Sequence, residues 1–159
     1  AVERPDFKVA RDDIELGDVA RRVSGLLALK AADHTISIHA PTDDILVPAV
    51  AEFRRTLQII LNLVNNAIRY SPDGTHIFID VCTVGAEAFI SVRDQGKGID
   101  PDDREKIFRK FERLGRSGDG GSGLGLYISR RLARAMGGEL HVQNAEDGGA
   151  IFTLRLPNC

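Results

Sequence analysis

The stretch from Glu52 to Ser71 constrains the fold of this chain most, because its sequence suits little besides a long amphipathic helix. It contains neither Gly nor Pro, and the turn signal Ser71-Pro72-Asp73-Gly74 closes it. At about 100° per residue, its apolar side chains gather into one stripe, formed by Phe53, Leu57, Ile60, Leu61, Val64 and Ile68. We therefore predict a helix that packs this stripe against the core.

A polar row runs beside the apolar stripe and consists of Gln58, Asn62, Asn66, Arg69 and Tyr70. Asparagine suits a helix interior poorly, because its amide competes with the backbone for hydrogen bonds. The row is either the solvated edge of a core helix or one wall of a ligand cleft. In a cleft, amide oxygens would bind a hard cation, Arg69 would meet a phosphate and Tyr70 would flank a base. The helix alone leaves both interpretations open.

Length, composition and charge narrow the class of protein. The chain has 159 residues, which fits one domain spanning residues 1–159. A net charge of -2 gives no electrostatic case for binding nucleic acid or an anionic membrane. No apolar run is long enough to span a bilayer, and no signal-peptide pattern is present. The two cysteines and four histidines lack metal-ligand spacing, which predicts reduced thiols in a cytoplasmic setting and no zinc site.

Strand and helix patterns interleave along the chain. We predict strands at residues 7–9, 35–39, 45–47, 76–84, 88–93, 139–143 and 150–156. We predict further helices beginning at Asp13 or Gly17, at Pro101 through Phe111, and at Leu126 through Met136. Tight turns join several strand pairs, which makes them antiparallel. The expected fold is an α/β (α+β) two-layer sandwich, with a mixed, largely antiparallel sheet and helices packed on one face.

Two motifs follow the predicted hairpin at 76–93. Asp94-Gln95-Gly96-Lys97-Gly98-Ile99 comes directly after a strand, and its glycines would let the backbone approach a flat ligand. Asp94 would accept a hydrogen bond from an exocyclic amine such as that of adenine. The alternative is an ordinary glycine-rich turn. Phe108 and Phe111 lie three residues apart, and in isolation that spacing favours core packing.

The third motif is the run from Gly115 to Gly125, which contains six glycines and leads into a helix. Backbone amides of such a loop can cradle a phosphate. The run matches GxGxxG from Gly118 to Gly123, but no strand precedes it, so the dinucleotide-binding context is missing. A lid over a bound nucleotide, at about residues 109–122, explains the glycine density better.

Together and in this order, these segments resemble the ATP-binding catalytic domain of bacterial sensor histidine kinases. That domain belongs to the gyrase, Hsp-ninety, histidine kinase and MutL (GHKL) group with the Bergerat-type ATP-binding fold. LNLVNNAIRYS looks like the N box of the family, DQGKGI its G1 box, IFRKFERL its F box and GGSGLGL its G2 box. Four boxes in order, over nearly the whole chain from Phe7, are far more specific than any one of them.

The resemblance implies a role for each matching residue. Asn66 and Asn62 would bind Mg²⁺, and both would act in catalysis together with Arg69 at the terminal phosphates. Asp94 would accept the adenine amine, and Tyr70, Gly96, Gly98 and Ile99 would line the pocket for ATP. The F-box and G2-box residues that would anchor the lid or meet the phosphates are Phe108, Phe111, Gly121, Ser122, Gly123, Leu124, Gly125 and Leu126.

The chain departs from complete sensor kinases in its histidines. Their phospho-acceptor histidine is usually followed by an acidic residue, whereas His34, His39, His76 and His141 are followed by Thr, Ala, Ile and Val. We therefore expect the phospho-acceptor domain to be absent and the chain to be a monomeric catalytic fragment. Its expected partners are the histidine-containing dimerisation domain of the same full-length protein and a downstream response regulator. The full-length protein would be cytoplasmic or a membrane-bound sensor with this domain in the cytoplasm.

Three alternatives share much of this pattern. A hydrolysing ATPase of the gyrase or chaperone branch would carry a Glu general base where Asn62 stands, and an amide lacks the required basicity. An anti-sigma-factor serine kinase is a closer relative, although the F-box and G2-box segments favour the sensor-kinase branch. A pseudokinase would keep the fold as a nucleotide-binding or interaction module without transferring phosphate. Intact Asn66, Asp94 and lid glycines count against that last interpretation.

Overall fold

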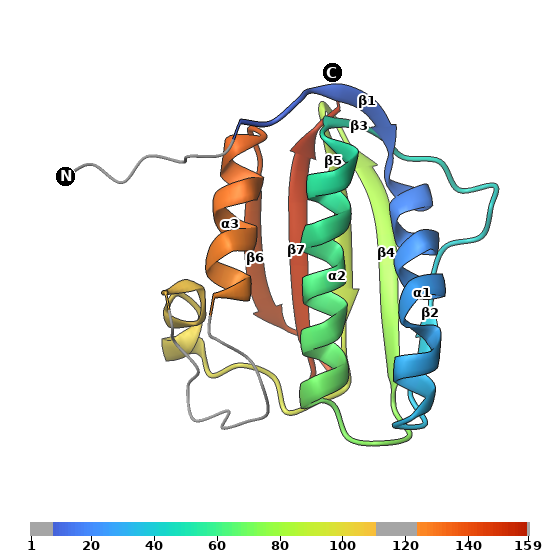
Figure 1. Ribbon diagram of the computed structural model, residues 1–159. Coiled ribbons are helices and arrows are strands. Elements are labelled where there is room, and N and C mark those ends of the chain that lie inside the picture. The colour runs from blue at the N-terminus through green and yellow to red at the C-terminus, as the bar shows by residue number, and fades with distance from the viewer. Residues whose placement is uncertain (1–7, 111–123, 159) are drawn as a thin grey trace.

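The computed structural model describes residues 8–110 and 124–158, and these form a layer of helices on one face of a mixed sheet (Figure 1). In the described chain, the sheet has the strand order β2-β4-β5-β7-β6. Its members are β2 (Ser37–His39), β4 (His76–Val84), β5 (Glu87–Arg93), β7 (Ala150–Pro157) and β6 (Glu139–Asn144). β2 pairs parallel with β4, and the other pairs are antiparallel, so the predicted two-layer sandwich is confirmed.

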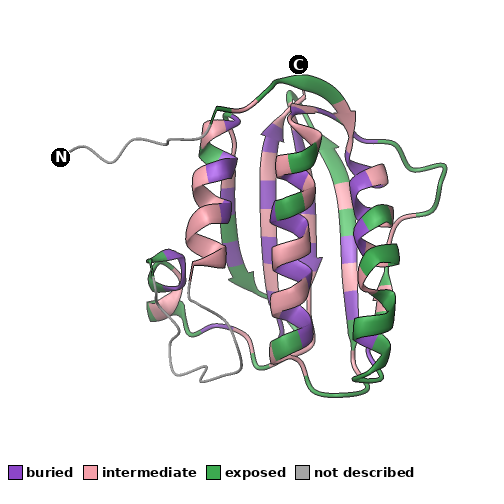
Figure 2. Ribbon diagram, in the orientation of Figure 1, coloured by how far each residue is buried: buried purple, intermediate pink, exposed green. Residues whose placement is uncertain are grey.

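Three α-helices in the described ranges cover this sheet: α1 (Leu16–Ala32), α2 (Phe53–Tyr70) and α3 (Gly125–Ala135). Figure 1 shows them side by side in front of the sheet, with α2 in the middle. The buried surfaces of the helices face the strands, and most exposed residues lie on the outer side (Figure 2). Two 3-10 helices, η1 (Pro101–Asp103) and η2 (Lys106–Phe108), stand near the base of α3.

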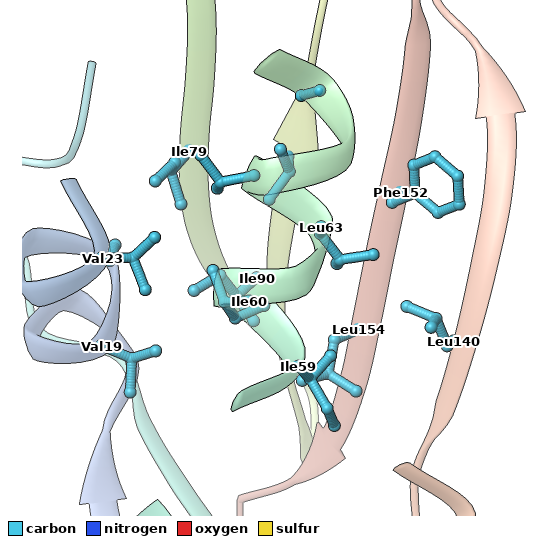
Figure 3. Close-up of a cluster of buried hydrophobic side chains, with 14 of the residues drawn as sticks. Val19, Val23, Ile59, Ile60, Leu63, Ile79, Ile90, Leu140, Phe152 and Leu154 are labelled. Atoms are coloured by element: carbon cyan, nitrogen blue, oxygen red, sulfur yellow. The ribbon is translucent and has the colours of Figure 1, made fainter. Parts of the chain in front are cut away.

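The core lies between the two layers. Ile59, Ile60 and Leu63 of α2 meet Ile90 and Leu154 from the central strands, as Figure 3 shows. Val19 and Val23 of α1 flank one side of this cluster, and Leu140 and Phe152 flank the other. α2 has α1 on one side, α3 on the other and the sheet behind it, so it buries a wide face at the centre of the core.

The predicted stripe on α2 is correct at Ile60, Val64 and Ile68 but is rotated elsewhere. Ile59 and Leu63 are fully buried, whereas Phe53, Leu57 and Leu61 are only half-buried where they pack against the core. The buried face also includes Thr56, whose hydroxyl donates to the Glu52 carbonyl at 2.9 Å. That internal hydrogen bond allows a polar residue in the core.

Two short strands were predicted wrongly near the N-terminus. Lys8 and Val9 are not in a strand, and Phe7 lies outside the described residues. The strand is instead β1 (Asp12–Glu15), and it pairs antiparallel with β3 (Pro48–Ala51) in a separate two-stranded sheet. The predicted strand at residues 45–47 therefore starts at Pro48 and does not neighbour β2. Pro48 suits the first position of such a strand, because it has no N–H to donate.

The segment after Pro101 does not form the continuous helix that was predicted. A helix through Phe111 was expected, but the described residues form two separate 3-10 turns, and Phe111 lies outside them. The β4–β5 and β6–β7 hairpins and α3 agree with prediction to within one or two residues. Their turns carry glycines at positive φ, Gly85 at 61° and Gly148 at 106°, which explains the clear sequence signal.

Candidate nucleotide site

Asn62 joins α2 to the start of α3. Its amide Nδ2 donates to Ser129 Oγ at 3.2 Å, and its side chain is half-buried. Gly125, the first residue of α3, lies so close that a Cβ there would overlap Asn62 Oδ1. With Nδ2 bound to Ser129, Oδ1 is the amide atom that can accept a cation or a hydrogen bond. The structure therefore brings together two residues predicted from separate boxes.

Asn66, one turn further along α2, is half-buried, and no hydrogen bond joins its side-chain amide to another described residue. Arg69 is exposed, and its guanidinium lies 5.9 Å from the centre of the Tyr70 ring. The carbonyl oxygen of Tyr70 packs against Gly96, where a Cβ would stand 3.0 Å away. The C-terminal end of α2 therefore meets the loop that carries Asp94.

The loop from Asp94 to Ile99 is held by hydrogen bonds at both ends. Asp94 Oδ1 accepts from the Gly96 N–H at 2.9 Å and from the Ala150 N–H at 3.1 Å. The other carboxylate oxygen, Oδ2, has no hydrogen bond with a described residue and remains able to accept one. Gly98 has a φ of +76°, a conformation that favours glycine, and the Ile99 side chain is buried.

Phe108 lies in the core rather than in a cleft. It is 5% exposed and meets Phe152 edge to face, with ring centres 6.3 Å apart. The guanidinium of Arg130 stacks 4.5 Å above its ring and also pairs with Glu105 at 3.0 Å and Glu139 at 3.2 Å. Arg130 thus links η2, α3 and β6 at the predicted base of the lid.

Glu139 completes this link. Burial raises the pKa of its carboxyl, but the Leu140 N–H, Arg130 and Arg134 together lower that pKa below its ordinary value. Glu139 is therefore ionised at neutral pH and holds both arginines of α3.

The predicted lid at residues 109–122 lies almost entirely outside the described residues, as do Phe111, Gly121, Ser122 and Gly123. The far end of the motif is described. Leu124 directly precedes α3, Gly125 begins it, and Leu126 packs half-buried against the core.

Two cavities border the predicted site residues. One groove of about 430 Å³ runs between α2 and α3, and Leu57, Leu61, Asn62, Gly125 and Ile128 are among its lining residues. A second cavity of about 490 Å³ is bordered by the residues from Lys97 to Pro101 together with Asp103 and Asn144. The first cavity thus lies between α2 and α3 beside Asn62. The second is separate from it and lies between the Asp94–Ile99 loop and η1.

The side-chain amides near this site suit a Mg²⁺ ion that is also bound by phosphate oxygens. They do not suit a metal ion held by protein ligands alone. Within the described ranges, no three His, Cys, Asp or Glu side chains gather closely enough to hold a metal ion. Mg²⁺ commonly keeps phosphate and water oxygens in its shell, so one or two amide oxygens from the protein suffice. The residues present are compatible with Mg-ATP on this ground.

Sequence reasoning missed Ser129, Arg130 and Asn144 as residues that hold the site together. Ser129 lies one helical turn after Gly125, which is a weak signal that it faces the same neighbour. Asn144 lies just beyond the strand predicted at residues 139–143 and was not among the predicted site residues. Its bonds reach a segment 45 residues away, so nothing in the local pattern indicates them.

The fold and the site define a two-layer nucleotide-binding domain, in which an amide-bearing helix meets a glycine-rich loop after a central strand. The chain belongs to the histidine kinase-, DNA gyrase B- and HSP90-like ATPase family, whose model matches residues 52–158.

Relatives place it near sensor kinases. The chain is 35% identical over 158 residues to the signal transduction histidine-protein kinase AfsQ2 of Streptomyces coelicolor, covering 98% of this chain and 29% of AfsQ2. Curated relatives of this kind are much longer, and the chain spans between 13% and 40% of their length.

Two solved structures are similar over most of the chain. Full-length ShkA in complex with AMPPNP has a TM-score of 0.83 and 29% identity, covering 95% of this chain and 32% of ShkA. The histidine kinase ThkA in complex with the response regulator protein TrrA has a TM-score of 0.79 and 26% identity. That match covers 95% of this chain and 42% of the ThkA chain.

Proposed function

We propose that this chain binds Mg-ATP and donates the γ-phosphoryl group to a histidine on the dimerisation domain of its own full-length protein. The main observation in support is the contact at the end of α2. There the helix that carries Asn62 and Asn66 meets the Asp94–Ile99 loop through Tyr70 and Gly96. Family membership and the similarity to the AMPPNP complex of ShkA support a nucleotide at this place.

When bound, Mg²⁺ would supply charge neutralisation at the phosphates, and the chain would contribute binding and orientation with no covalent step of its own. Asn66 supplies an amide oxygen to the metal, and Asn62 Oδ1 supplies a second. Arg69 meets the terminal phosphates, and Asp94 Oδ2 accepts the base amine. Gly125 and the amides at the start of α3 approach the phosphates, where the helix dipole favours negative charge.

Vigorous hydrolysis of ATP is not part of the proposed activity. A hydrolysing relative needs a general base near the terminal phosphate, and the amide of Asn62 cannot accept a proton at neutral pH. Its Nδ2 is also bound to Ser129, which fixes the side chain in a structural contact.

The partners follow from the same proposal. The histidine acceptor would lie in the part of the full-length protein outside this chain, and the phosphoryl group would pass onward to a response regulator. The complex of ThkA with TrrA supports a regulator of that class.

None of the helices in the described portion has the length and apolar character needed to cross a membrane. The cytoplasmic location expected from the sequence remains part of the proposal.

Calorimetric titration with AMPPNP, with and without Mg²⁺, tests the nucleotide site. We expect Mg-dependent binding to the unmodified chain and loss of the Mg²⁺ dependence in Asn66→Ala. Asn65→Ala is the matched control, because its amide lies next along the same helix and accepts from Lys30 Nζ at 2.6 Å.

The possible results separate the candidate functions. Unchanged Mg²⁺ dependence in Asn66→Ala removes Asn66 from the metal site. Absence of AMPPNP binding to a folded chain removes the kinase proposal and leaves an interaction module. Binding without transfer to a supplied dimerisation domain favours the pseudokinase, and transfer to a serine favours the anti-sigma-factor type.

A further inference from the structure

The turn between β6 and β7 packs against the Asp94–Ile99 loop, although the two segments are distant in sequence. At the start of the loop, Asp94 N donates to the Ala150 carbonyl at 3.0 Å, and Ala150 N donates back to Asp94 Oδ1 at 3.1 Å. Gly149 leaves no room there, since a Cβ would overlap the Asp94 carbonyl oxygen. The first residue of β7 therefore fixes the first residue of the loop.

Asn144, the last residue of β6, binds the other end of the loop with both groups of its amide. Its Oδ1 accepts from the Ile99 N–H at 2.8 Å, and its Nδ2 donates to the Ile99 carbonyl at 2.8 Å. A side chain that pairs with both polar groups of one residue fixes the position and the rotation of that stretch of backbone. The Ile99 side chain is also buried, which restrains it from the other side.

The same amide restricts Gly98. A Cβ on Gly98 would stand 2.7 Å from Asn144 Oδ1 and 2.7 Å from the Gly148 carbonyl oxygen. The positive φ of Gly98 and this close approach both require glycine. Asn144 therefore fixes the two residues that follow Gly96 and Lys97 in the loop.

The turn that carries Asn144 is itself held in place. Ala145 N donates to the Gly149 carbonyl at 2.6 Å, and Gly148 N donates to the Ala145 carbonyl at 3.0 Å. An ion pair of 3.7 Å joins Asp147 to Arg93, the last residue of β5. These contacts let the turn act as a firm support for the loop.

We propose that Asn144 is a positioning residue for the nucleotide, which holds Gly98 and Ile99 in their binding geometry through the backbone of Ile99. This inference rests on the proposed adenine-nucleotide function of the Asp94–Ile99 loop. A loop with two glycines loses much conformational freedom when a ligand orders it. Because Asn144 orders the loop before the ligand arrives, it strengthens binding without touching the phosphates.

The first test compares AMPPNP affinity in the presence of Mg²⁺ for the unmodified chain and for Asn144→Ala. We expect the Kd to rise about tenfold, because the variant loses two hydrogen bonds that order the loop. Asn158→Ala is the matched control, since Asn158 Nδ2 also donates to a backbone carbonyl, that of Gly85 at 3.2 Å. That bond lies at the β4–β5 turn, and we expect the control to keep its Kd.

Asn144→Asp is a second variant that keeps the shape of the side chain. The carboxylate still accepts from the Ile99 N–H, but its other oxygen faces the Ile99 carbonyl oxygen and repels it. We expect a loss of affinity at least as large as in Asn144→Ala. In a phosphotransfer assay, the KM for ATP should rise in both variants, while the rate at saturating ATP stays unchanged.

Hydrogen exchange at the Ile99 amide tests the clamp without any nucleotide. We expect faster exchange in Asn144→Ala and unchanged exchange in Asn158→Ala. Unchanged exchange at Ile99, or an unchanged Kd in both Asn144 variants with only a lower melting temperature, would overturn the inference. If the unmodified chain fails to bind AMPPNP, the proposed function fails, and the positioning role falls with it even where the clamp itself is confirmed by exchange.

Discussion

At the scale of single residues, Asp94 uses its two carboxylate oxygens differently. Oδ1 accepts from the Gly96 and Ala150 amides and so shapes the loop, while Oδ2 has no described partner. The isosteric change Asp94→Asn can keep Oδ1 in its backbone bonds and replace only Oδ2 by an NH₂ group. It therefore separates the structural contribution of Asp94 from its contribution to base recognition.

We expect Asp94→Asn to weaken adenine nucleotides about tenfold or more, because a hydrogen bond to a charged acceptor is lost and a donor then faces the adenine amine. Guanine nucleotides should lose much less. Titration with ADP and GDP measures both affinities. Asp100→Asn is a suitable control, since Asp100 also accepts from a backbone N–H nearby, that of Asp102 at 3.2 Å. Equal losses for the two bases would remove Asp94 from adenine recognition.

Two helical glycines allow a paired prediction on packing. In α1, a Cβ on Gly25 would meet nothing within 4 Å, so Gly25→Ala should stabilise the chain by about 0.5–1 kcal/mol through helix propensity. In α3, a Cβ on Gly125 would overlap the Asn62 amide, which Ser129 holds in place. Gly125→Ala should therefore destabilise the chain by about 1–3 kcal/mol.

Urea unfolding of both variants measures these changes in the free energy of unfolding. If Gly125→Ala were as stabilising as Gly25→Ala, the contact between Asn62 and the start of α3 would not be as tight as the structure has it.

The residues that we propose touch a ligand were easier to find in the sequence than the residues that support them. Asn62, Asp94 and Gly125 stand in local patterns that indicate chemistry, whereas Asn144 and Ser129 act on partners 45 and 67 positions away. Side chain to backbone bonds between distant segments leave no periodicity and no spacing in the sequence. Such hydrogen bonds become visible only when the fold brings the two segments together.

At the scale of elements, the start of α1 depends on Glu15. Its carboxylate caps the helix by accepting from the Gly17 and Asp18 amides, accepts from the Val47 N–H at 3.0 Å, and pairs with Arg21 at 3.0 Å. One side chain thus joins α1 to the segment that leads into β3.

This arrangement makes stability depend on pH. Burial raises the pKa of Glu15, but the three backbone N–H groups and Arg21 together lower it below the ordinary value of 4.5. A lowered folded-state pKa contributes stability that is present above the unfolded pKa and is lost as the pH falls through the folded pKa.

We expect Glu15→Gln to lower the free energy of unfolding by about 1–2 kcal/mol at pH 7. The difference between the variant and the unmodified chain should shrink as the pH falls below about 4.5, where the Glu15 carboxyl becomes protonated in the unfolded state and then in the folded state. Urea unfolding at several pH values measures it. A difference that stays constant from pH 7 to pH 3 would show that the Glu15 charge is not responsible.

Long elements were predicted well and short ones poorly, for a physical reason. The 18 residues of α2 carry enough periodicity to define the helix from the sequence. β1 and β3 have four residues each, and their extended conformation depends on pairing with each other. Ile45 to Val47 is more apolar than β3, yet Pro48–Ala51 forms the strand because it lies opposite Asp12–Glu15.

At the scale of the whole molecule, we expect none of the four histidines to accept a phosphoryl group. His39 and His76 bind each other through their ring nitrogens at 2.8 Å, on neighbouring strands β2 and β4. His34 pairs with Asp73 at 3.5 Å, and His141 lies on the edge strand β6. His76 also donates its backbone N–H to Gln95 Oε1 in the Asp94–Ile99 loop at 2.8 Å, whereas its ring is held by His39.

We therefore expect the chain, incubated alone with Mg²⁺ and γ-labelled ATP, to remain unlabelled. Adding the dimerisation domain of the full-length protein should produce label on that domain, since the reaction requires only that an acceptor histidine reach the bound phosphates. Asn66→Ala should abolish the label, and a His39→Gln, His76→Gln double variant should leave it unchanged. Electrophoresis with acid and alkali treatment distinguishes phosphohistidine, which is stable only in alkali. Acid-labile label on the chain itself would show that it carries its own acceptor histidine.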